Sequence, residues 1–134
     1  MFEKLTKKEQ LILLAGIFEG EGWFGLNRTN KVNYTPVAVL EVQMSDEDIV
    51  KKFQRYCNLN KNIFFKPKRK EHHKDQYRFT ITGKRALQFM EDMLPYLGIR
   101  RKEQYYHVVK SIGNGPKNWS PPILEQTKNQ TSNV

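Results

Sequence analysis

The chain switches several times between a helical and an alternating pattern of apolar positions. Apolar residues recur at helical spacing between Thr6 and Gly22, and Glu9 stands three residues after Thr6, as in a helix capping box. Alternating runs at 23–28 and 37–43, with a polar turn between them, then predict a β-hairpin. The first third of the chain is therefore expected to form a helix followed by two antiparallel strands.

The same order of elements returns further along the chain. Ser45, followed by three acidic residues, is expected to cap a second helix. Alternating runs at 62–66 and 76–82 predict a second hairpin with a basic tip. A third helix follows directly, breaks at Pro95, and is succeeded by an amphipathic helix expected over 100–112.

This order of helix, strand, strand, helix, strand, strand, helix, helix predicts an α+β fold of the αββαββα type. Consecutive hairpins favour a mostly antiparallel four-stranded sheet, with helices on one face and the other face free. We expect a single domain over residues 1–112. Residues 113–134 are rich in Asn, Pro, Gln, Thr and Ser, and are expected to form a polar tail or a wrapping arm.

The net charge of the chain indicates which class of partner it binds. The 134 residues include 23 Lys or Arg and 14 Asp or Glu, a formal net charge of +9, which favours polyanions and above all nucleic acid. Cys57 is the only cysteine, which excludes an intrachain disulfide. Neither a signal peptide nor a long apolar run is recognisable, so we expect an intracellular protein in a reducing compartment, with no membrane partner.

The free face of the sheet is the expected surface for double-stranded DNA, since sheets and two-stranded ribbons fit the major groove. Basic residues in the turn of the first hairpin, at the tip of the second hairpin and at the start of the last helix are expected to contact phosphates. The adjacent His72 and His73 are expected to point in opposite directions, a poor arrangement for joint metal binding. The predicted DNA contacts are Asn27, Arg28, Lys31, Glu41, Gln43, Lys66, Lys68, Arg69, Lys70, Arg78, Thr80, Arg100 and Arg101.

Gly16 and Gly20 stand four residues apart and therefore share one face of the first helix. Small residues let two helix backbones approach closely, so two copies of this helix are expected to cross with two-fold symmetry. Glu21 would then lie near its twin, and paired carboxylates suit Mg²⁺ ions beside scissile phosphates. The predicted dimer interface consists of Leu14, Gly16, Ile17 and Gly20.

Residues 14–22, Leu-Ala-Gly-Ile-Phe-Glu-Gly-Glu-Gly, resemble the nine-residue signature of the LAGLIDADG homing endonucleases. Ile17 and Phe18 are apolar replacements, Gly20 takes the place of the usual Ala, and both acids are Glu. Element order and length resemble the single-motif members of that family over roughly residues 5–112. The resemblance implies a homodimeric enzyme of intron homing that makes metal-dependent double-strand breaks in a long, roughly palindromic DNA target. Its implied cofactor is Mg²⁺, with Mn²⁺ as a substitute.

The resemblance also implies roles for single residues. Glu21 falls on the metal-binding acid of the family, and the backbone carbonyl of Gly20 on a second metal contact. Gln43, at the end of the second strand, is implied to orient the solvent around the reactive water. Lys84, at the start of the helix after the fourth strand, is implied to act on water or phosphate. Glu19 is interpreted as a structural residue.

The chain departs from the family pattern at two points, and two alternatives stay open. Glu in place of Asp extends the carboxylate by one methylene, and Glu47 stands where some relatives carry a basic residue. A non-cleaving DNA-binding regulator on the same fold, or a maturase that binds its intron RNA, also agrees with the basic composition. A cleavage assay separates these functions.

Overall fold

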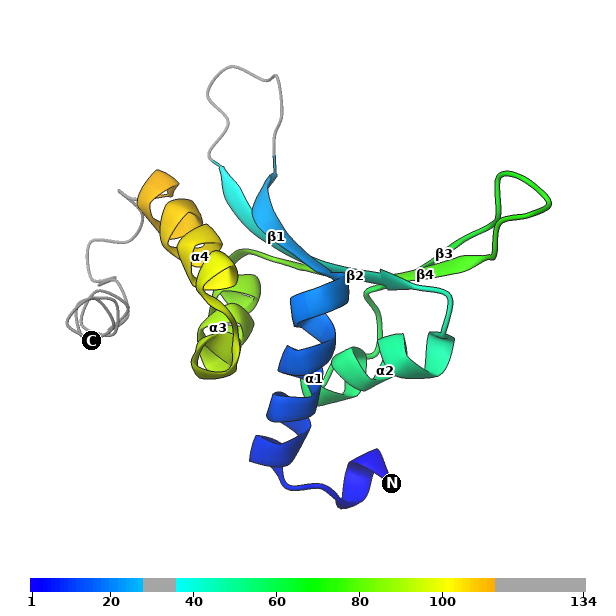
Figure 1. Ribbon diagram of the computed structural model, residues 1–134, viewed down its shortest axis with the longest axis horizontal. Coiled ribbons are helices and arrows are strands. Elements are labelled where there is room, and N and C mark those ends of the chain that lie inside the picture. The colour runs from blue at the N-terminus through cyan, green and yellow to red at the C-terminus, as the bar shows by residue number, and fades with distance from the viewer. Residues whose placement is uncertain (28–35, 113–134) are drawn as a thin grey trace.

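The computed structural model describes residues 1–27 and 36–112 (Figure 1). Apart from two short 3-10 helices, the predicted order of elements is confirmed. None of the described helices combines the length and the apolar character needed to cross a membrane. The predicted contacts Arg28 and Lys31 and the predicted tail at 113–134 lie outside the described residues. The elements are η1 (Phe2–Lys4), α1 (Lys7–Glu21), β1 (Gly22–Asn27), β2 (Val37–Met44), α2 (Glu47–Tyr56), β3 (Ile63–Lys66), β4 (Gln76–Thr82), α3 (Gly83–Met93), η2 (Leu94–Tyr96) and α4 (Ile99–Ser111).

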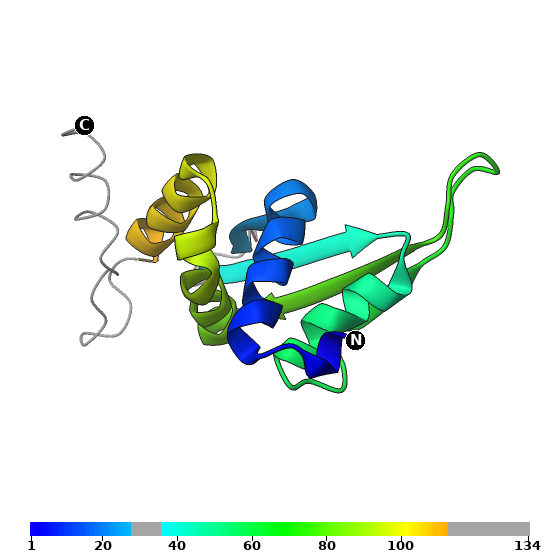
Figure 2. The same ribbon diagram turned by 60° about the horizontal axis from the view of Figure 1, so that its bottom comes forward.

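The four strands form one antiparallel sheet in the order β1-β2-β4-β3, so its two central strands come from different hairpins. Trp23 of β1 pairs with Glu41 of β2, and Glu41 pairs with Thr80 of β4. Figures 1 and 2 show that the described helices all lie on one side of the sheet. The predicted α+β fold is therefore confirmed, with one face covered by helices and the other left free by the described residues.

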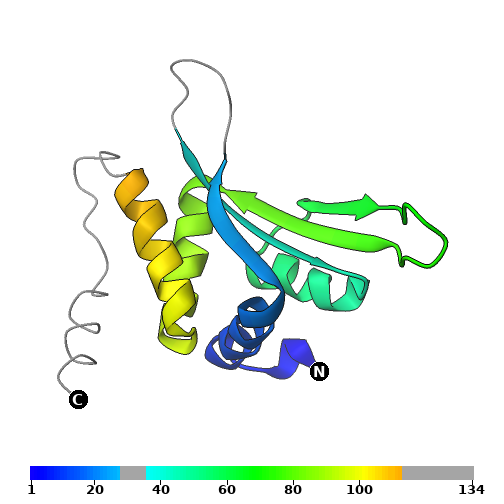
Figure 3. The same cartoon turned by 45° about the horizontal axis from the view of Figure 1, so that its top comes forward.

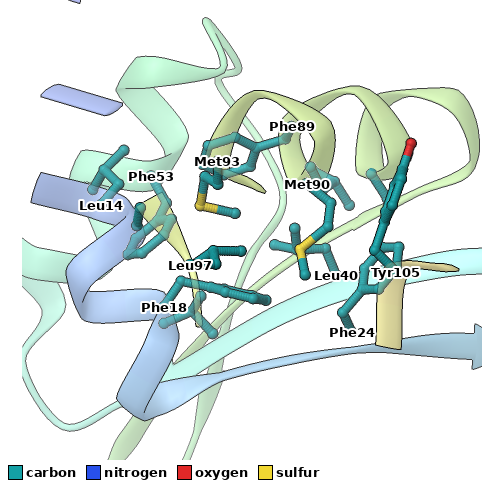
Figure 4. Close-up of a cluster of buried hydrophobic side chains, with 14 of the residues drawn as sticks. Leu14, Phe18, Phe24, Leu40, Phe53, Phe89, Met90, Met93, Leu97 and Tyr105 are labelled. Carbon is teal, nitrogen blue, oxygen red and sulfur yellow. The ribbon is translucent and has the colours of Figure 1, made fainter. Parts of the chain in front are cut away.

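Alternate strand residues and the inner faces of the helices form a single hydrophobic core (Figure 4). Phe24 of β1 stacks on Tyr105 of α4 with ring centroids 6.0 Å apart. Phe53 of α2 meets Phe89 of α3 edge-on, with centroids 6.1 Å apart. Leu40 is fully buried in the middle of the sheet. Since each buried side chain of this size contributes about 1.5–3 kcal/mol, this core is the main source of stability.

The start of α1 is fixed by the predicted capping box. Glu9 N donates to Thr6 Oγ1 at 3.1 Å, and Thr6 N donates to Glu9 Oε1 at 2.9 Å. The hydrogen bonds from Thr6 hold the pKa of the Glu9 carboxyl below its ordinary value. Lys7 Nζ donates to the carbonyl of Tyr56 at 2.7 Å and so joins α1 to α2.

The cap of α2 differs from the prediction. The N-cap residue is Asp46, not Ser45, and no side-chain hydrogen bond caps this helix. Glu47 and Asp48 nevertheless lie in its first turn. Their charges stabilise the positive end of the helix dipole, which explains why the helix forms without a capping side chain.

The orientation predicted for the two adjacent histidines is wrong. His72 and His73 lie in a turn rather than in an extended segment, and His73 N donates to the carbonyl of Lys70 at 2.9 Å. The turn brings the imidazole rings edge to face, with centroids 4.3 Å apart. The alternation rule for extended chains does not apply to them.

Candidate functional site

One side of α1 carries apolar residues and glycines that the described chain does not cover. Ile12 and Leu13 are 43% and 40% exposed. A Cβ atom built on Gly16 or Gly20 would meet nothing within 4 Å. The prediction that Leu14 belongs to this face is wrong, because Leu14 is fully buried in the core (Figure 4).

The packing of the described residues does not require the two glycines on this face. Glycine in a helix interior is about 1 kcal/mol less favourable than alanine, and no described neighbour needs the small size of Gly16 or Gly20. Gly22 is different, because a Cβ there would collide with the ring of Phe18. Ile17, also predicted at the interface, is half-buried and packs against the core. The glycines at 16 and 20 therefore indicate close approach by something outside the described residues.

Glu21 stands at the junction of α1 and β1. It is the last residue of the helix, and Gly22 is the first residue of the strand, so no loop separates them (Figure 3). Glu21 and Gly20 are both exposed. A carboxylate beside a backbone carbonyl offers the oxygen ligands that Mg²⁺ prefers. Within residues 1–27 and 36–112, no three acidic, His or Cys side chains gather into a cation site.

The free face of the sheet carries six of the predicted DNA contacts. Directly paired residues of antiparallel strands point to the same side, and neighbours along a strand point to opposite sides. Leu40, Val42 and Phe79 point into the core, so their neighbours point outward. The same rule adds Trp23 and Phe64, which are 48% and 50% exposed. The six predicted residues on this face are Asn27, Glu41, Gln43, Lys66, Arg78 and Thr80.

Several side chains of the free face are held in place by one another. Lys66 Nζ lies 3.4 Å from Gln43 Oε1, and the guanidinium of Arg78 lies 5.6 Å from the centre of the Phe64 ring. Arg78 Nε and Thr80 Oγ1 are enclosed, yet they have no hydrogen-bond partner among the described residues. Because enclosed polar atoms are normally hydrogen-bonded, these two atoms are open to a ligand or to water on this face.

The tip of the second hairpin is strongly basic. Lys68, Arg69 and Lys70 are all exposed there, as predicted. The backbone N of Lys68 donates to Asp75 Oδ1 at 2.9 Å, which closes the base of the loop. The loop therefore carries three exposed cationic residues, and its backbone extends beyond the end of the sheet (Figure 1).

The structure does not bring all the predicted catalytic residues together. The strand register places Glu21, just before β1, beside the end of β2 that carries Gln43. The end of β4 pairs with Val39 instead. Val39 lies about 13 Å from Gln43 along β2, at about 3.3 Å per residue, and Lys84 follows in α3 beyond that end of β4. The geometry joins Glu21 with Gln43 and leaves Lys84 apart.

The prediction that Arg101 contacts DNA is wrong, because its side chain turns inward and is only 5% exposed. Its Nη2 lies 2.7 Å from the carbonyl oxygen of Gly22, 3.2 Å from that of Glu19 and 3.4 Å from that of Phe18. Burial lowers the pKa of this guanidinium, Arg100 lowers it further, and Glu19 opposes both. Arg100 itself is exposed in the first turn of α4.

Glu19 joins α1 to the start of α4. Its Oε1 accepts a hydrogen bond from Gly98 N at 3.0 Å, and its Oε2 lies 3.6 Å from Arg101 Nε. A Cβ at position 98 would lie too close to this carboxylate, so a larger residue there would displace the Glu19 side chain. Glu19 therefore has a structural role between two helices, and Glu21 is the free acid of the pair.

The family model that describes the LAGLIDADG-like domain matches residues 8–113 of this chain. The chain belongs to this family. The match begins in α1, ends just beyond α4 and so includes every strand of the sheet. No curated protein matches the chain in a sequence search.

Solved structures with a similar fold are homing endonucleases. The homing endonuclease I-CvuI in complex with its target in the presence of Ca has a TM-score of 0.62 and 21% identity, over 90% of this chain and 76% of that one. The LAGLIDADG meganuclease I-CpaMI bound to uncleaved DNA has a TM-score of 0.56 and 19% identity, over 92% of this chain and 38% of that one. The archaeal intron-encoded I-Vdi141I complexed with DNA has a TM-score of 0.55 and 8% identity, over 96% and 100%. At these identities the likeness establishes the fold.

Proposed function

We propose that this LAGLIDADG-family protein is a site-specific DNA endonuclease that acts as a homodimer and cuts both strands with Mg²⁺, which Mn²⁺ can replace. The observation that carries the proposal is the place of Glu21. This exposed carboxylate stands where the uncovered face of α1 meets the uncovered face of the sheet. A second subunit that packs on α1 and a DNA duplex that binds the free face of the sheet would both lie close to Glu21.

The homodimer is supported by the uncovered face of α1. Ile12 and Leu13 leave apolar surface in water, while Gly16 and Gly20 leave open space beside the helix backbone. A second copy of α1 crossing at the glycines removes both unfavourable features at once. In that arrangement the two Glu21 residues face each other across the symmetry axis.

The end of α1 fits a hard divalent cation. The Glu21 carboxylate and the Gly20 carbonyl supply oxygen ligands, and the partner's Glu21 and DNA phosphates complete the set. Bound Mg²⁺ would activate a water molecule and neutralise charge on the leaving oxygen. Gln43, at the adjoining strand end, orients that water through its amide. Arg100, exposed on α4 just before the residue that contacts the end of α1, takes the phosphate-binding role that Lys84 is too distant to perform.

The free face of the sheet is the proposed DNA surface. The similar structures I-CvuI, I-CpaMI and I-Vdi141I are complexes with DNA, which supports this choice. Glu41, Gln43 and Arg78 present acceptors and donors of the kind that distinguish base edges in the major groove. The basic tip at 68–70 binds phosphates and fixes the position of the subunit along the duplex.

The test begins with selection of cleavable sites from a random duplex library in Mg²⁺. We expect wild-type protein to cut a defined site. Glu21→Gln should abolish cutting, because its neutral amide is a poor cation ligand, and should leave binding of the same duplex without divalent ions intact. Glu103→Gln, which neutralises an exposed carboxylate on α4, is the matched control and should cut normally.

The possible outcomes separate the candidate functions. Equal cutting by Glu21→Gln would end the catalytic assignment. Specific binding of duplex DNA by wild-type protein without any cutting would instead indicate a regulator on this fold. Tight binding of intron RNA, with no cutting of DNA, would indicate a maturase.

A further inference from the structure

Among the described residues, the charged side chain that is buried is that of Arg101. It comes from the first turn of α4 and reaches the end of α1, 79 to 83 residues earlier in the chain. A single nitrogen, Nη2, serves the carbonyl oxygens of Phe18, Glu19 and Gly22 at 3.4, 3.2 and 2.7 Å. These carbonyls flank Gly20 and Glu21 on both sides.

The other contacts of Arg101 fix the plane of its guanidinium. Nη1 donates to Gln104 Oε1 at 3.0 Å, and Nε lies 3.6 Å from Glu19 Oε2. The guanidinium carbon lies 5.0 Å from the centre of the Phe18 ring. Its position is therefore set from α4, from a carboxylate of α1 and from an aromatic ring of the core.

The site explains why a charged side chain is buried here. The last carbonyl groups of a helix are short of partners within the helix. At the end of α1 the backbone N of Gly22 donates to the carbonyl of Phe18, and Arg101 supplies a donor to the carbonyl of Glu19 as well. A cation at this end also complements the helix dipole. Burying a charge costs free energy unless it is paired and hydrogen-bonded. Arg101 is paired with Glu19 and hydrogen-bonded through Nη1 and Nη2, while its Nε has no hydrogen-bond partner among the described residues.

We propose that Arg101 is a positioning residue that holds the last turn of α1 in the geometry in which the Gly20 carbonyl and the Glu21 carboxylate bind the cation. This inference rests on the proposed function. Residues behind the direct ligands of a metal site commonly orient those ligands, and their loss lowers metal affinity by about 10–100-fold. Arg101 orients the Gly20 carbonyl and the Glu21 carboxylate by holding the backbone on either side of these two residues.

If Arg101 acts only through its charge or instead positions the ligands, its removal should change cation affinity in opposite directions. A positive charge beside a cation site repels the cation, so removal of Arg101 would tighten cation binding if charge were its only contribution. If Arg101 positions the ligands, its removal loosens the turn and weakens cation binding. The sign of the change therefore distinguishes the two roles.

The experiment measures the Ca²⁺ concentration that half-saturates the Ca²⁺-dependent part of DNA binding, a readout that needs no cleavage. We expect Arg101→Gln to raise this concentration by roughly 10–100-fold. Arg101→Lys should give a smaller increase, because an ammonium contacts the carbonyls at one point and lacks the fork of the guanidinium. Binding to the duplex without divalent ions should not change, because Arg101 does not reach the DNA surface.

Val108→Ala is the control for a general loss of stability. Val108 is 3% exposed on the same helix, and its truncation destabilises the core while leaving the end of α1 in place. We expect this variant to keep the wild-type Ca²⁺ requirement. All proteins are compared at a temperature where urea denaturation shows each to be folded.

An unchanged or lower Ca²⁺ requirement in Arg101→Gln would overturn the positioning role. If Arg101→Gln does not fold, Arg101→Lys decides, and a wild-type Ca²⁺ requirement in that variant overturns the role as well. The proposed function has a separate test, because it fails when Glu21→Gln cuts like wild type. If Glu21→Gln fails to cut, as expected, but the Arg101 variants keep the wild-type Ca²⁺ requirement, only the positioning role of Arg101 is refuted and the proposed function stands.

Discussion

The substitution Gly16→Ala should act in opposite directions on the subunit and on the dimer. Within the part of the subunit that the structure describes, a Cβ atom at this position meets nothing within 4 Å. Alanine is about 1 kcal/mol more favourable than glycine in a helix interior. The free energy of unfolding of the isolated subunit should therefore rise by about 1 kcal/mol.

In the proposed dimer the same methyl group enters the helix crossing, and two-fold symmetry introduces it twice. Overpacking of a close contact costs about 1–3 kcal/mol per site. Two sites should weaken association by at least about 2 kcal/mol, which raises the dissociation constant roughly 30-fold. A bulky side chain at Gly16 or Gly20 should go further and release monomers.

Two measurements separate these effects. Sedimentation equilibrium over a range of concentrations gives the dimer dissociation constant, and urea denaturation of diluted, monomeric protein gives the stability of the subunit. The control is His107→Ala, which raises helix propensity at an exposed position of α4 and should leave dimerisation unchanged. A Gly16→Ala protein with wild-type association would refute the helix crossing, and a less stable subunit would refute the open space at position 16.

Two further predictions concern the α1–β1 junction and the hairpin tip. Gly22→Ala should lower the free energy of unfolding by about 1–3 kcal/mol in urea denaturation, because its Cβ collides with the Phe18 ring; a neutral effect would show that the junction relaxes freely. Joint replacement of Lys68, Arg69 and Lys70 by Ala should weaken binding to all duplexes and reduce the slope of log K against log salt by about 0.9 for each phosphate that the variant no longer neutralises. An unchanged slope of log K against log salt would show that the tip does not contact DNA phosphates.

Most of the fold could be predicted because its signals are local. The capping box of Thr6 and Glu9 marks the start of α1 in four consecutive residues. The two-residue period of each strand separates core positions such as Val42 from outward ones such as Gln43. The motif at the end of α1 indicates Glu21, whose exposed place at the junction with β1 agrees with its predicted role.

The parts that could not be predicted depend on residues far apart in the chain. Basic residues near a helix start are usually solvated, and nothing local shows that Arg101 turns inward to carbonyls some 80 residues earlier. The separation of Lys84 from Gln43 follows only from the register between β2 and β4. The prediction for Leu14 fails because α1 is apolar on nearly all sides, so helical periodicity alone does not identify the inward face.

The direct passage from Glu21 into β1 has an evolutionary consequence. Residues at the beginning of β1 cannot change their fit to a new DNA sequence without also shifting the acid, since no flexible link separates the two. The outer strand β3 and its tip lie at the far side of the sheet (Figure 1) and are free of that constraint. Descendants of this protein that acquire new targets should therefore accumulate substitutions first at the periphery and last beside the junction.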